Sequence, residues 1–268
     1  MVNRFEIDKI ISAVSPLWGY CRFSSVENHL IPCRAKIRIP SGTKTVIVCA
    51  FPYLLPEDKY KNRNVSKYAV VADYHEVALN RLNAACVELK ALYPNEEFAV
   101  FADNSAIPEV RAACLAGLGT EGRNSLLITE LYGSYVFIGE IVTTLEIKAE
   151  ESAVEPCIGC GKCISACPGN ALTESGIIRE KCLSEITQKK GELSEKEKEL
   201  LAACGCAWGC DICQDVCPMN KNAQTTQIEE FIASARPCIA EDTPAENRAY
   251  EWRGKKVIDR NIKIIKGE

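Results

Sequence analysis

Apolar positions along the first 150 residues follow two periodicities. Two continuous runs rich in β-branched and aromatic residues, TVIVCAF and EFAVFAD, indicate buried strands. Other stretches carry apolar residues at helical spacing. In chain order the pattern predicts an amphipathic helix within 1–19, a strand at 45–51, a helix within 67–92, a strand at 97–103, a short helix from Pro108 to Gly117 or Gly119, and β-rich segments at 125–129 and 134–147. This mixture predicts a layered α+β fold.

The pattern changes near residue 152, where an apolar run gives way to KAEESAVEP. Beyond it we expect little regular structure between the cysteines, because metal would replace a hydrophobic core. Ser194 followed by Glu197 matches a capping box and predicts a short helix through Leu201. The polar tail with a basic end either packs on the body or frays. We therefore expect three parts: 1–152, an α/β domain; 153–222, a cysteine-rich module; and 223–268, a C-terminal tail.

Composition narrows the class of protein. The chain has 268 residues, 16 cysteines and a net charge of −4. A chain this long can bury a core without disulfides, and the acidic balance gives no basic footprint for nucleic acid over the whole chain. No stretch approaches the roughly 20 apolar residues of a membrane helix, and the N-terminus lacks a signal-peptide core. We therefore expect no membrane association and a reducing cytoplasmic location, where cysteines serve as metal ligands or catalysts.

Ten of the cysteines fall within residues 157–217. The first four have the spacing C-x2-C-x2-C-x3-C and precede a proline: Cys157, Cys160, Cys163, Cys167 and Pro168. This spacing is typical of bacterial ferredoxins, in which three thiolates bind one four-iron cluster and the fourth binds a second cluster. Two C-x2-C pairs would also suit zinc. The additional cysteine and the following proline favour iron–sulfur clusters.

A second run has the spacing C-x2-C-x3-C-P and consists of Cys210, Cys213, Cys217 and Pro218. A complete copy of the first motif would need a cysteine where Ala207 stands. By the crossed arrangement, Cys217 completes the first cluster and Cys167 joins the second. The second cluster then needs one more ligand, and spacing alone leaves three candidates: Cys182, Cys204 and Cys206.

Two adjacent clusters form a path for single electrons. A ferredoxin-type carrier is the simplest function for such a path. A carrier has no need of a further 150-residue α/β domain, so we expect that domain to hold something that the clusters reduce.

Several segments in a fixed order match one known family. They are IPSGTKTVIVCAFPY (39–53), VSKYAVVADYHEV (65–77), residues 101–147 beginning FADNSAIPEVR, KCLSEIT (181–187), and the two cysteine runs. On these residues the chain resembles the cobalamin-dependent epoxyqueuosine reductases, relatives of the reductive dehalogenases. The resemblance implies a nitroreductase-like α/β domain that binds cobalamin, followed by a ferredoxin-like module with two 4Fe-4S clusters.

The resemblance also implies an electron path and a proton donor. Electrons from an external low-potential donor would pass through the clusters to cobalt, and an aspartate would donate a proton to the substrate. Asp103 matches that aspartate, and Cys182 in KCLSEIT matches the segment that supplies the remaining cluster ligand. Independently, Asp103 lies between a predicted strand and a predicted helix, a common position for site residues. Capping the helix or turn is the more common role of Asp at such a junction.

Further residues match family segments that contact cobalamin: Tyr68, Tyr74, Arg123, Gly133, Ser134 and Tyr135. All of them except Tyr68 have a simpler alternative. Tyr74 could pack in a helix core, Gly133 could form a hairpin turn, and Arg123 could form an exposed salt bridge. For His75 a hydrogen-bonded or surface role is favoured over cobalt ligation, since the resemblance implies base-off cobalamin without a histidine ligand.

The chain also departs from the family. Only about 50 residues follow Cys217, too few for several helical repeats of ~40 residues each, which many relatives use to grip tRNA. Met219 replaces the family's tryptophan in its CPWN element. The leading hypothesis is therefore an iron–sulfur oxidoreductase in queuosine biosynthesis and tRNA processing, acting on epoxyqueuosine in tRNA or on another substrate. The alternatives are a ferredoxin-type carrier and a reductase of a corrinoid bound to a partner protein.

Overall fold

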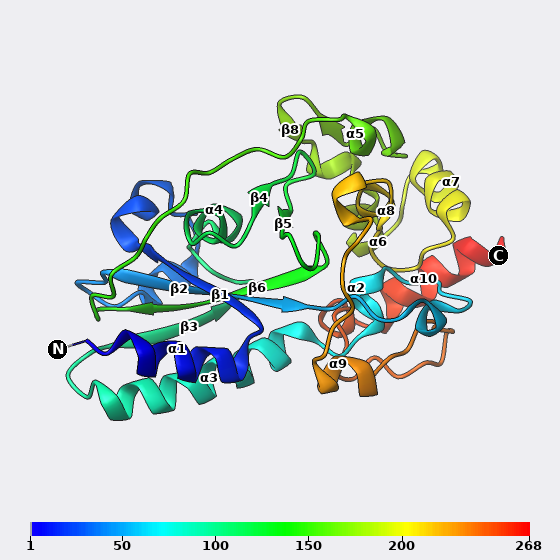
Figure 1. Ribbon diagram of the computed structural model, residues 1–268. Coiled ribbons are helices and arrows are strands. Elements are labelled where there is room, and N and C mark those ends of the chain that lie inside the picture. The colour runs from blue at the N-terminus through cyan, green and yellow to red at the C-terminus, as the bar shows by residue number, and fades with distance from the viewer. Residues whose placement is uncertain (1) are drawn as a thin grey trace.

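The computed structural model describes residues 2–268 and contains a four-stranded antiparallel sheet (Figure 1). The strands occur in the order β1-β2-β6-β3. Their bounds are Leu17–Arg22 for β1, Thr45–Pro52 for β2, Phe98–Ala102 for β3 and Val136–Thr143 for β6. The structure confirms the strands predicted at 45–51 and 97–103. Strand β1 was not predicted, because LWGYCR is short and has no clear alternation.

Central strand β2 separates two hydrophobic layers. All eight of its residues are buried, and successive side chains point to opposite faces of the sheet. Ile47, Cys49 and Phe51 belong to the larger hydrophobic cluster, whereas Val46, Val48 and Ala50 belong to the smaller one. In Figure 1 helices α1 (Arg4–Val14) and α3 (Tyr74–Leu92) lie below the sheet, and α4 (Glu109–Leu115) lies above it. The layered architecture expected from the sequence is confirmed.

The helix predicted within 67–92 is two helices. Helix α2 spans Lys67–Val70, and α3 begins at Tyr74. Asp73 lies between them, and its carboxylate accepts a hydrogen bond from the backbone N–H of His75. This cap fixes the start of α3, because a side-chain oxygen satisfies an N–H that has no partner within the helix. The residues between the two helices contact the C-terminal segment, since Ala72 N–H donates to the Ser234 hydroxyl and Arg248 donates to the Val71 carbonyl.

The cysteine-rich part contains several short elements, where the sequence predicts little regular structure apart from the helix after Ser194. After β4 (Thr120–Glu121) and β5 (Leu127–Ile128), the elements are α5 (Lys162–Ala166), β7 (Leu172–Thr173), β8 (Gly176–Ile177), α6 (Leu183–Gln188), α7 (Glu195–Cys204) and α8 (Ile212–Asp215). Helix α7 begins with the capping box of Ser194 and Glu197 that the sequence predicts. It continues to Cys204, three residues beyond the predicted end, and Gly205 terminates it in a left-handed conformation.

The C-terminal segment packs into the body of the protein. The segment 223–268 contains helices α9 (Glu229–Ala233) and α10 (Lys255–Lys266). From these helices and the loops around them it places seven side chains in the larger hydrophobic cluster: Ile228, Phe231, Ile239, Tyr250, Val257, Ile258 and Ile262. The buried Asn261 amide donates to the carbonyl oxygens of Thr187 and Ala207. The tail that the sequence left undecided is therefore part of the core. Among residues 2–268 no helix combines the length and hydrophobicity needed to cross a membrane.

Candidate functional site

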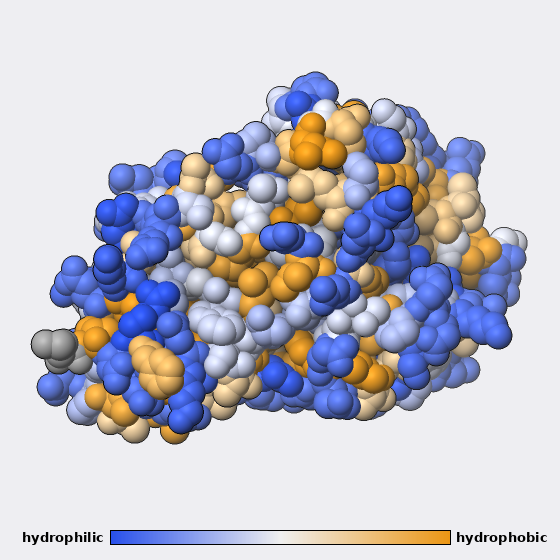
Figure 2. All heavy atoms as spheres, viewed as in Figure 1, coloured by the Kyte–Doolittle hydropathy of each residue, from blue (hydrophilic) through white to orange (hydrophobic). Residues whose placement is uncertain are grey.

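We call residues 2–152, which contain the four-stranded sheet, the sheet part. A cavity of about 960 Å³ lies where the sheet part meets the cysteine-rich part, residues 153–222. Apolar side chains gather in the centre of the face shown in Figure 2, between these two parts. The lining comes from the α2–α3 junction, the ends of β3 and β6, helix α6, both cysteine runs and the C-terminal segment. Its members include Tyr68, Asp73, Tyr74, His75, Asp103, Ser134, Phe137, Cys167, Cys182, Cys210, Cys213 and Trp252. Residues far apart in sequence thus share one cavity.

Three polar side chains form a chain along one wall. His75 Nδ1 lies 2.7 Å from Asp73 Oδ1, and His75 Nε2 lies 2.9 Å from Asp103 Oδ2. Asp103 follows β3 directly and adopts a φ of +59°, a left-handed conformation that is uncommon for non-glycine residues and in which Asp is enriched. The structure therefore brings Asp103 into the cavity beside His75.

The histidine and the aspartate influence each other's protonation. The hydrogen bond from His75 lowers the pKa of Asp103, against the opposing effect of burial. Burial acts to lower the pKa of His75, but the hydrogen bonds to Asp103 and Asp73 outweigh it and raise this pKa to about 9. At neutral pH the imidazole is therefore protonated and Asp103 ionised. Within the pair of Asp103 and His75, the proton is therefore bound to His75.

Aromatic packing fixes the imidazole. The Tyr74 ring stacks on His75 at a centroid distance of 4.0 Å and on Phe137 at 4.1 Å. Tyr68 meets Phe137 edge-on at 6.4 Å. Burial raises the pKa of both tyrosines, so both are neutral phenols at physiological pH. Tyr68 and Tyr74 thus form an aromatic wall next to the Asp103–His75 pair.

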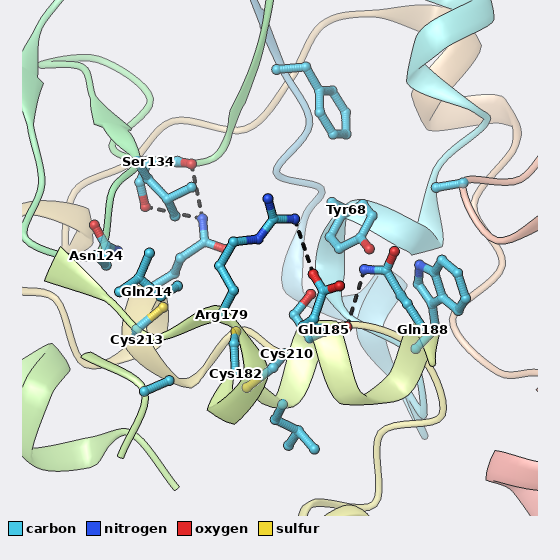
Figure 3. Close-up of a pocket in the computed structure, with 18 of the residues that line it drawn as sticks. Tyr68, Asn124, Ser134, Arg179, Cys182, Glu185, Gln188, Cys210, Cys213 and Gln214 are labelled. Carbon is cyan, nitrogen blue, oxygen red and sulfur yellow. Dashed lines mark hydrogen bonds and ion pairs between the residues drawn. The ribbon is translucent and has the colours of Figure 1, made fainter. Parts of the chain in front are cut away.

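The turn at residues 133–135 is held against the second cysteine run. The Asn220 side chain accepts a hydrogen bond from Ser134 N–H at 2.8 Å, and Gln214 Nε2 donates to the Ser134 carbonyl at 2.9 Å. Figure 3 shows Ser134 and Gln214 directed toward each other. Gly133 adopts a φ of +55°, and a Cβ there would lie 2.3 Å from Asn220 Oδ1. Gly133 is therefore required for this close approach.

Of the predicted cobalamin contacts, the structure places Tyr68, Tyr74 and Ser134 on the cavity wall. Gly133 and Tyr135 lie behind the wall, and the Tyr135 hydroxyl donates to Asp215 at 3.1 Å. Arg123 lies elsewhere. It forms an ion pair with Glu174, the alternative that the sequence left open, and it borders the first cysteine group.

The eight predicted cluster cysteines separate into two groups. Cys167, Cys182, Cys210 and Cys213 line the large cavity, whereas Cys157, Cys160, Cys163 and Cys217 line a smaller pocket with Gly161 and Met219. Each pocket is thus lined by the four cysteines predicted for one cluster, and the assignment of ligands stays a prediction. Among residues 2–268 no three His, Cys, Asp or Glu side chains converge as ligands of a single metal ion. A four-iron cluster holds each thiolate on a different iron.

The three candidates for the remaining ligand differ in position. Cys182 lies in the large cavity, and Figure 3 shows its side chain next to that of Cys210. The Cys204 thiol lies within hydrogen-bonding reach of Cys210 but does not line the cavity. Cys206 is buried, and its thiol donates to the Trp208 carbonyl at 3.2 Å. Position therefore favours Cys182, then Cys204.

Sequence reasoning missed several residues of the site. Gln214 and Asn220 orient the turn at Ser134. Gln214 and Asn220 flank cysteines of the second run, which was the available signal. Trp252 and Arg253 on the cavity rim had no motif to mark them.

Comparison with known proteins identifies the family of the chain. A model described as "Epoxyqueuosine reductase QueG, DUF1730" matches residues 36–104, and one described as "4Fe-4S double cluster binding domain" matches residues 156–220. An epoxyqueuosine reductase from Cyclobacterium marinum is 30% identical over 265 residues, covering 92% of this chain and 84% of that protein.

Solved structures agree. Epoxyqueuosine reductase from Streptococcus thermophilus superposes with a TM-score of 0.81 at 25% identity, covering 99% of this chain and 81% of that one. A second epoxyqueuosine reductase, in complex with an epoxyqueuosine-modified tRNA stem loop, has a TM-score of 0.82 at 22% identity and covers 98% and 80%.

The chain is shorter than many relatives, spanning 61%, 54% and 63% of three other curated epoxyqueuosine reductases. The matches nevertheless cover both the α/β part and the cysteine-rich part. The resemblance deduced from the sequence is therefore confirmed, and with it the expected fold and the cluster and cobalamin cofactors of that family. The chain belongs to the epoxyqueuosine reductase family.

Proposed function

We propose that this protein is a reductase that receives electrons from an external low-potential donor through two 4Fe-4S clusters and reduces epoxyqueuosine in tRNA with cobalamin bound in the large cavity. One observation carries the proposal: the cavity joins Asp103 to Cys182 and to three cysteines of the ferredoxin pattern, Cys167, Cys210 and Cys213. The similar fold that binds an epoxyqueuosine-modified tRNA stem loop supports the choice of substrate.

We assign Cys157, Cys160, Cys163 and Cys217 to the first cluster and Cys167, Cys182, Cys210 and Cys213 to the second. The separate pockets support this division. The second cluster would lie on the cavity wall, so it would be the one that transfers electrons into the cavity. All 16 cysteines are free, as a reducing cytoplasm would keep them.

The cavity fits a large cofactor. Its volume lies near the upper end of the ~300–1,000 Å³ typical of small-molecule sites, and its lining is mostly apolar with a few polar groups. Tyr68, Tyr74 and Ser134 would contact the corrinoid, while Gly133 and Tyr135 position Ser134. Arg123 has no direct place in this site. Bound cobalamin would supply strongly reducing chemistry next to the cluster cysteines.

Residues of the cavity wall would supply a proton to the substrate. Reduction of an epoxide to an alkene consumes two electrons and two protons, and the oxygen leaves as water. Asp103 faces the cavity and would donate a proton to the leaving oxygen. Because Asp103 is ionised at rest, it must first receive the proton from His75 Nε2, which lies 2.9 Å away. Asp73 holds the other ring nitrogen and keeps the imidazole oriented.

Anaerobic reconstitution with iron, sulfide and cobalamin tests the proposal. We expect about eight irons and one cobalamin per chain, and conversion of epoxyqueuosine-containing tRNA when a strong reductant is supplied. A protein that holds eight irons but never retains cobalamin would instead be a ferredoxin-type carrier or a reductase of a partner's corrinoid.

Asp103→Asn tests the proton donor. We expect clusters and cobalamin to be retained while turnover falls by about 10²–10⁴-fold, the usual contribution of a general acid. Unchanged turnover would exclude Asp103 from this role.

A further inference from the structure

One edge of the large cavity carries an exposed tryptophan. Trp252 lies in a 3-10 helix at Glu251–Arg253 and is 58% exposed, although it lines the cavity. The guanidinium of Arg253 lies 3.8 Å from the centroid of the Trp252 ring. An exposed tryptophan with a cation on its ring is a common element of binding sites for planar or anionic groups.

The cation of this pair has no partner within the protein. Among residues 2–268 Arg253 forms no ion pair and no side-chain hydrogen bond, and its Nε is buried without an acceptor. The neighbouring carboxylate of Glu251 already accepts a hydrogen bond from the backbone of Asn247. The other cavity arginine, Arg179, is paired with Glu185 at 3.2 Å. Arg253 is therefore the cavity arginine that is available to an anionic ligand.

Buried neighbours hold the segment that carries Trp252 and Arg253 in place. Tyr250 is buried, and its ring meets the buried Trp208 at 6.0 Å. Arg248 is also buried and donates to the carbonyl oxygens of Val70 and Val71 next to the aromatic wall. The segment that presents Trp252 is thus fixed before a ligand arrives, which lowers the entropic cost of binding.

We propose that Trp252 and Arg253 bind a nucleotide of the RNA substrate beside the modified base, with the base stacked on the indole and its phosphate held by the guanidinium. The proposal rests on the proposed function. Stacking on an aromatic side chain tolerates any base, and a local cation is needed because the chain as a whole is acidic. The high exposure of Trp252 places it where a macromolecule can reach it.

The test measures binding of an epoxyqueuosine-containing anticodon stem-loop RNA to the reconstituted protein by fluorescence anisotropy. We expect Trp252→Ala to raise the Kd about 5- to 150-fold, as the loss of one stacked base predicts, and to raise KM with little change in kcat. Trp252→Phe should retain most of the affinity. Arg253→Gln should weaken binding and reduce the slope of log Kd against log salt by about one.

Matched controls are Phe5→Ala, an exposed aromatic on α1, and Arg34→Gln, an exposed arginine, both outside the cavity. Neither should change the Kd. Wild-type conversion of the RNA combined with an unchanged Kd in Trp252→Ala would overturn this inference and leave the proposed function standing. Absence of binding to the wild-type protein would overturn both.

A second arm compares retention of cobalamin with that of cobinamide, which lacks the nucleotide loop. Under the proposal, Trp252→Ala retains both corrinoids as the wild type does. If the variant loses affinity for cobalamin but not for cobinamide, the pair binds the nucleotide of the cofactor, and the assignment to RNA is wrong.

Discussion

The sheet part and the cysteine-rich part reach stability by different means. Strand β2 is buried along its whole length between two hydrophobic layers. The cysteine-rich part has a hydrophobic cluster of its own with only four buried members: Leu183, Ile186, Leu193 and Leu201. Since apolar burial is the main stabilising contribution in ordinary domains, the second part must depend on bonds between thiolates and metal. We therefore expect loss of a cluster ligand to unfold the cysteine-rich part and truncation of a core side chain to destabilise the sheet part.

The two parts meet through specific polar contacts. Gln214 and Asn220 of the second cysteine run hydrogen-bond to Ser134 beside β6, and an ion pair joins Arg63 to Asp211. The cavity lies along this boundary. A site located there can combine a rigid scaffold from the sheet part with electron transfer from the cysteine-rich part.

Loss of a cluster ligand should have the largest effect and should be confined to one part. In Cys182→Ser we expect the second cluster to be lost, turnover to fall to background, and hydrogen exchange to increase within residues 182–217 while the sheet stays protected. Iron content, electron paramagnetic resonance and hydrogen exchange check this.

Cys33→Ser, at an exposed cysteine, is the control and should leave all three measurements unchanged. If Cys182→Ser retains eight irons, Cys204 is the next ligand to replace, because its thiol reaches Cys210.

A core truncation in the C-terminal segment should affect the sheet part. Phe231 is fully buried in the larger hydrophobic cluster, so Phe231→Ala should lower the free energy of unfolding by about 3–5 kcal/mol. Denaturant unfolding of the reconstituted protein measures it, with Phe5→Ala as an exposed control. A change below about 1 kcal/mol would show that the segment contributes little to the core.

The buried carboxyl group of Glu140 should make the stability of the sheet part depend on pH. Glu140 lies in the middle of β6, fully buried opposite Val48 and Phe101, and neither carboxyl oxygen has a hydrogen-bond partner of normal geometry among residues 2–268. Burial raises its pKa to about 8. The folded state therefore binds more protons than the unfolded state between about pH 4.5 and pH 8, and stability falls as pH rises through this range.

Glu140→Gln removes this titration. We expect similar unfolding free energies for variant and wild type near pH 5 and a variant more stable by a few kcal/mol above pH 8. Thermal unfolding across this range provides the measurement. Parallel pH profiles for the two proteins would contradict the prediction.

The smallest effect should come from a helix cap in the cysteine-rich part. Ser194→Ala removes the capping box of α7 and should cost about 1 kcal/mol. The loss should appear as local hydrogen exchange in α7. Ser41→Ala, at an exposed serine, should change nothing. A global loss of stability from Ser194→Ala would contradict the view that the cysteine-rich part depends mainly on its metal.

Features that depend on near neighbours in the chain can be predicted from the sequence alone. Periodicity predicts the strands at 45–51 and 97–103, because each is a local run of apolar residues. The capping box at Ser194 joins residues three apart. The ferredoxin spacing likewise requires thiolates close together in the chain. The segment around Asp103 could be matched to a family for the same reason.

Contacts between residues far apart in the chain become visible only in the folded structure. Strand β1 is held in the sheet by its pairing with β2. The C-terminal segment is held against the body of the protein by the burial of Phe231 and Tyr250. Packing places Cys182 but not Cys204 on the cavity wall, directs Asp103 toward His75, and brings Trp252 to the cavity rim. Contacts of this kind join residues from 23 positions apart, as in Arg22 with Thr45, to 178 positions apart, as in Arg248 with Val70. Over such separations no local periodicity or spacing constrains the chain, so the balance of burial and hydrogen bonding over the whole fold sets them.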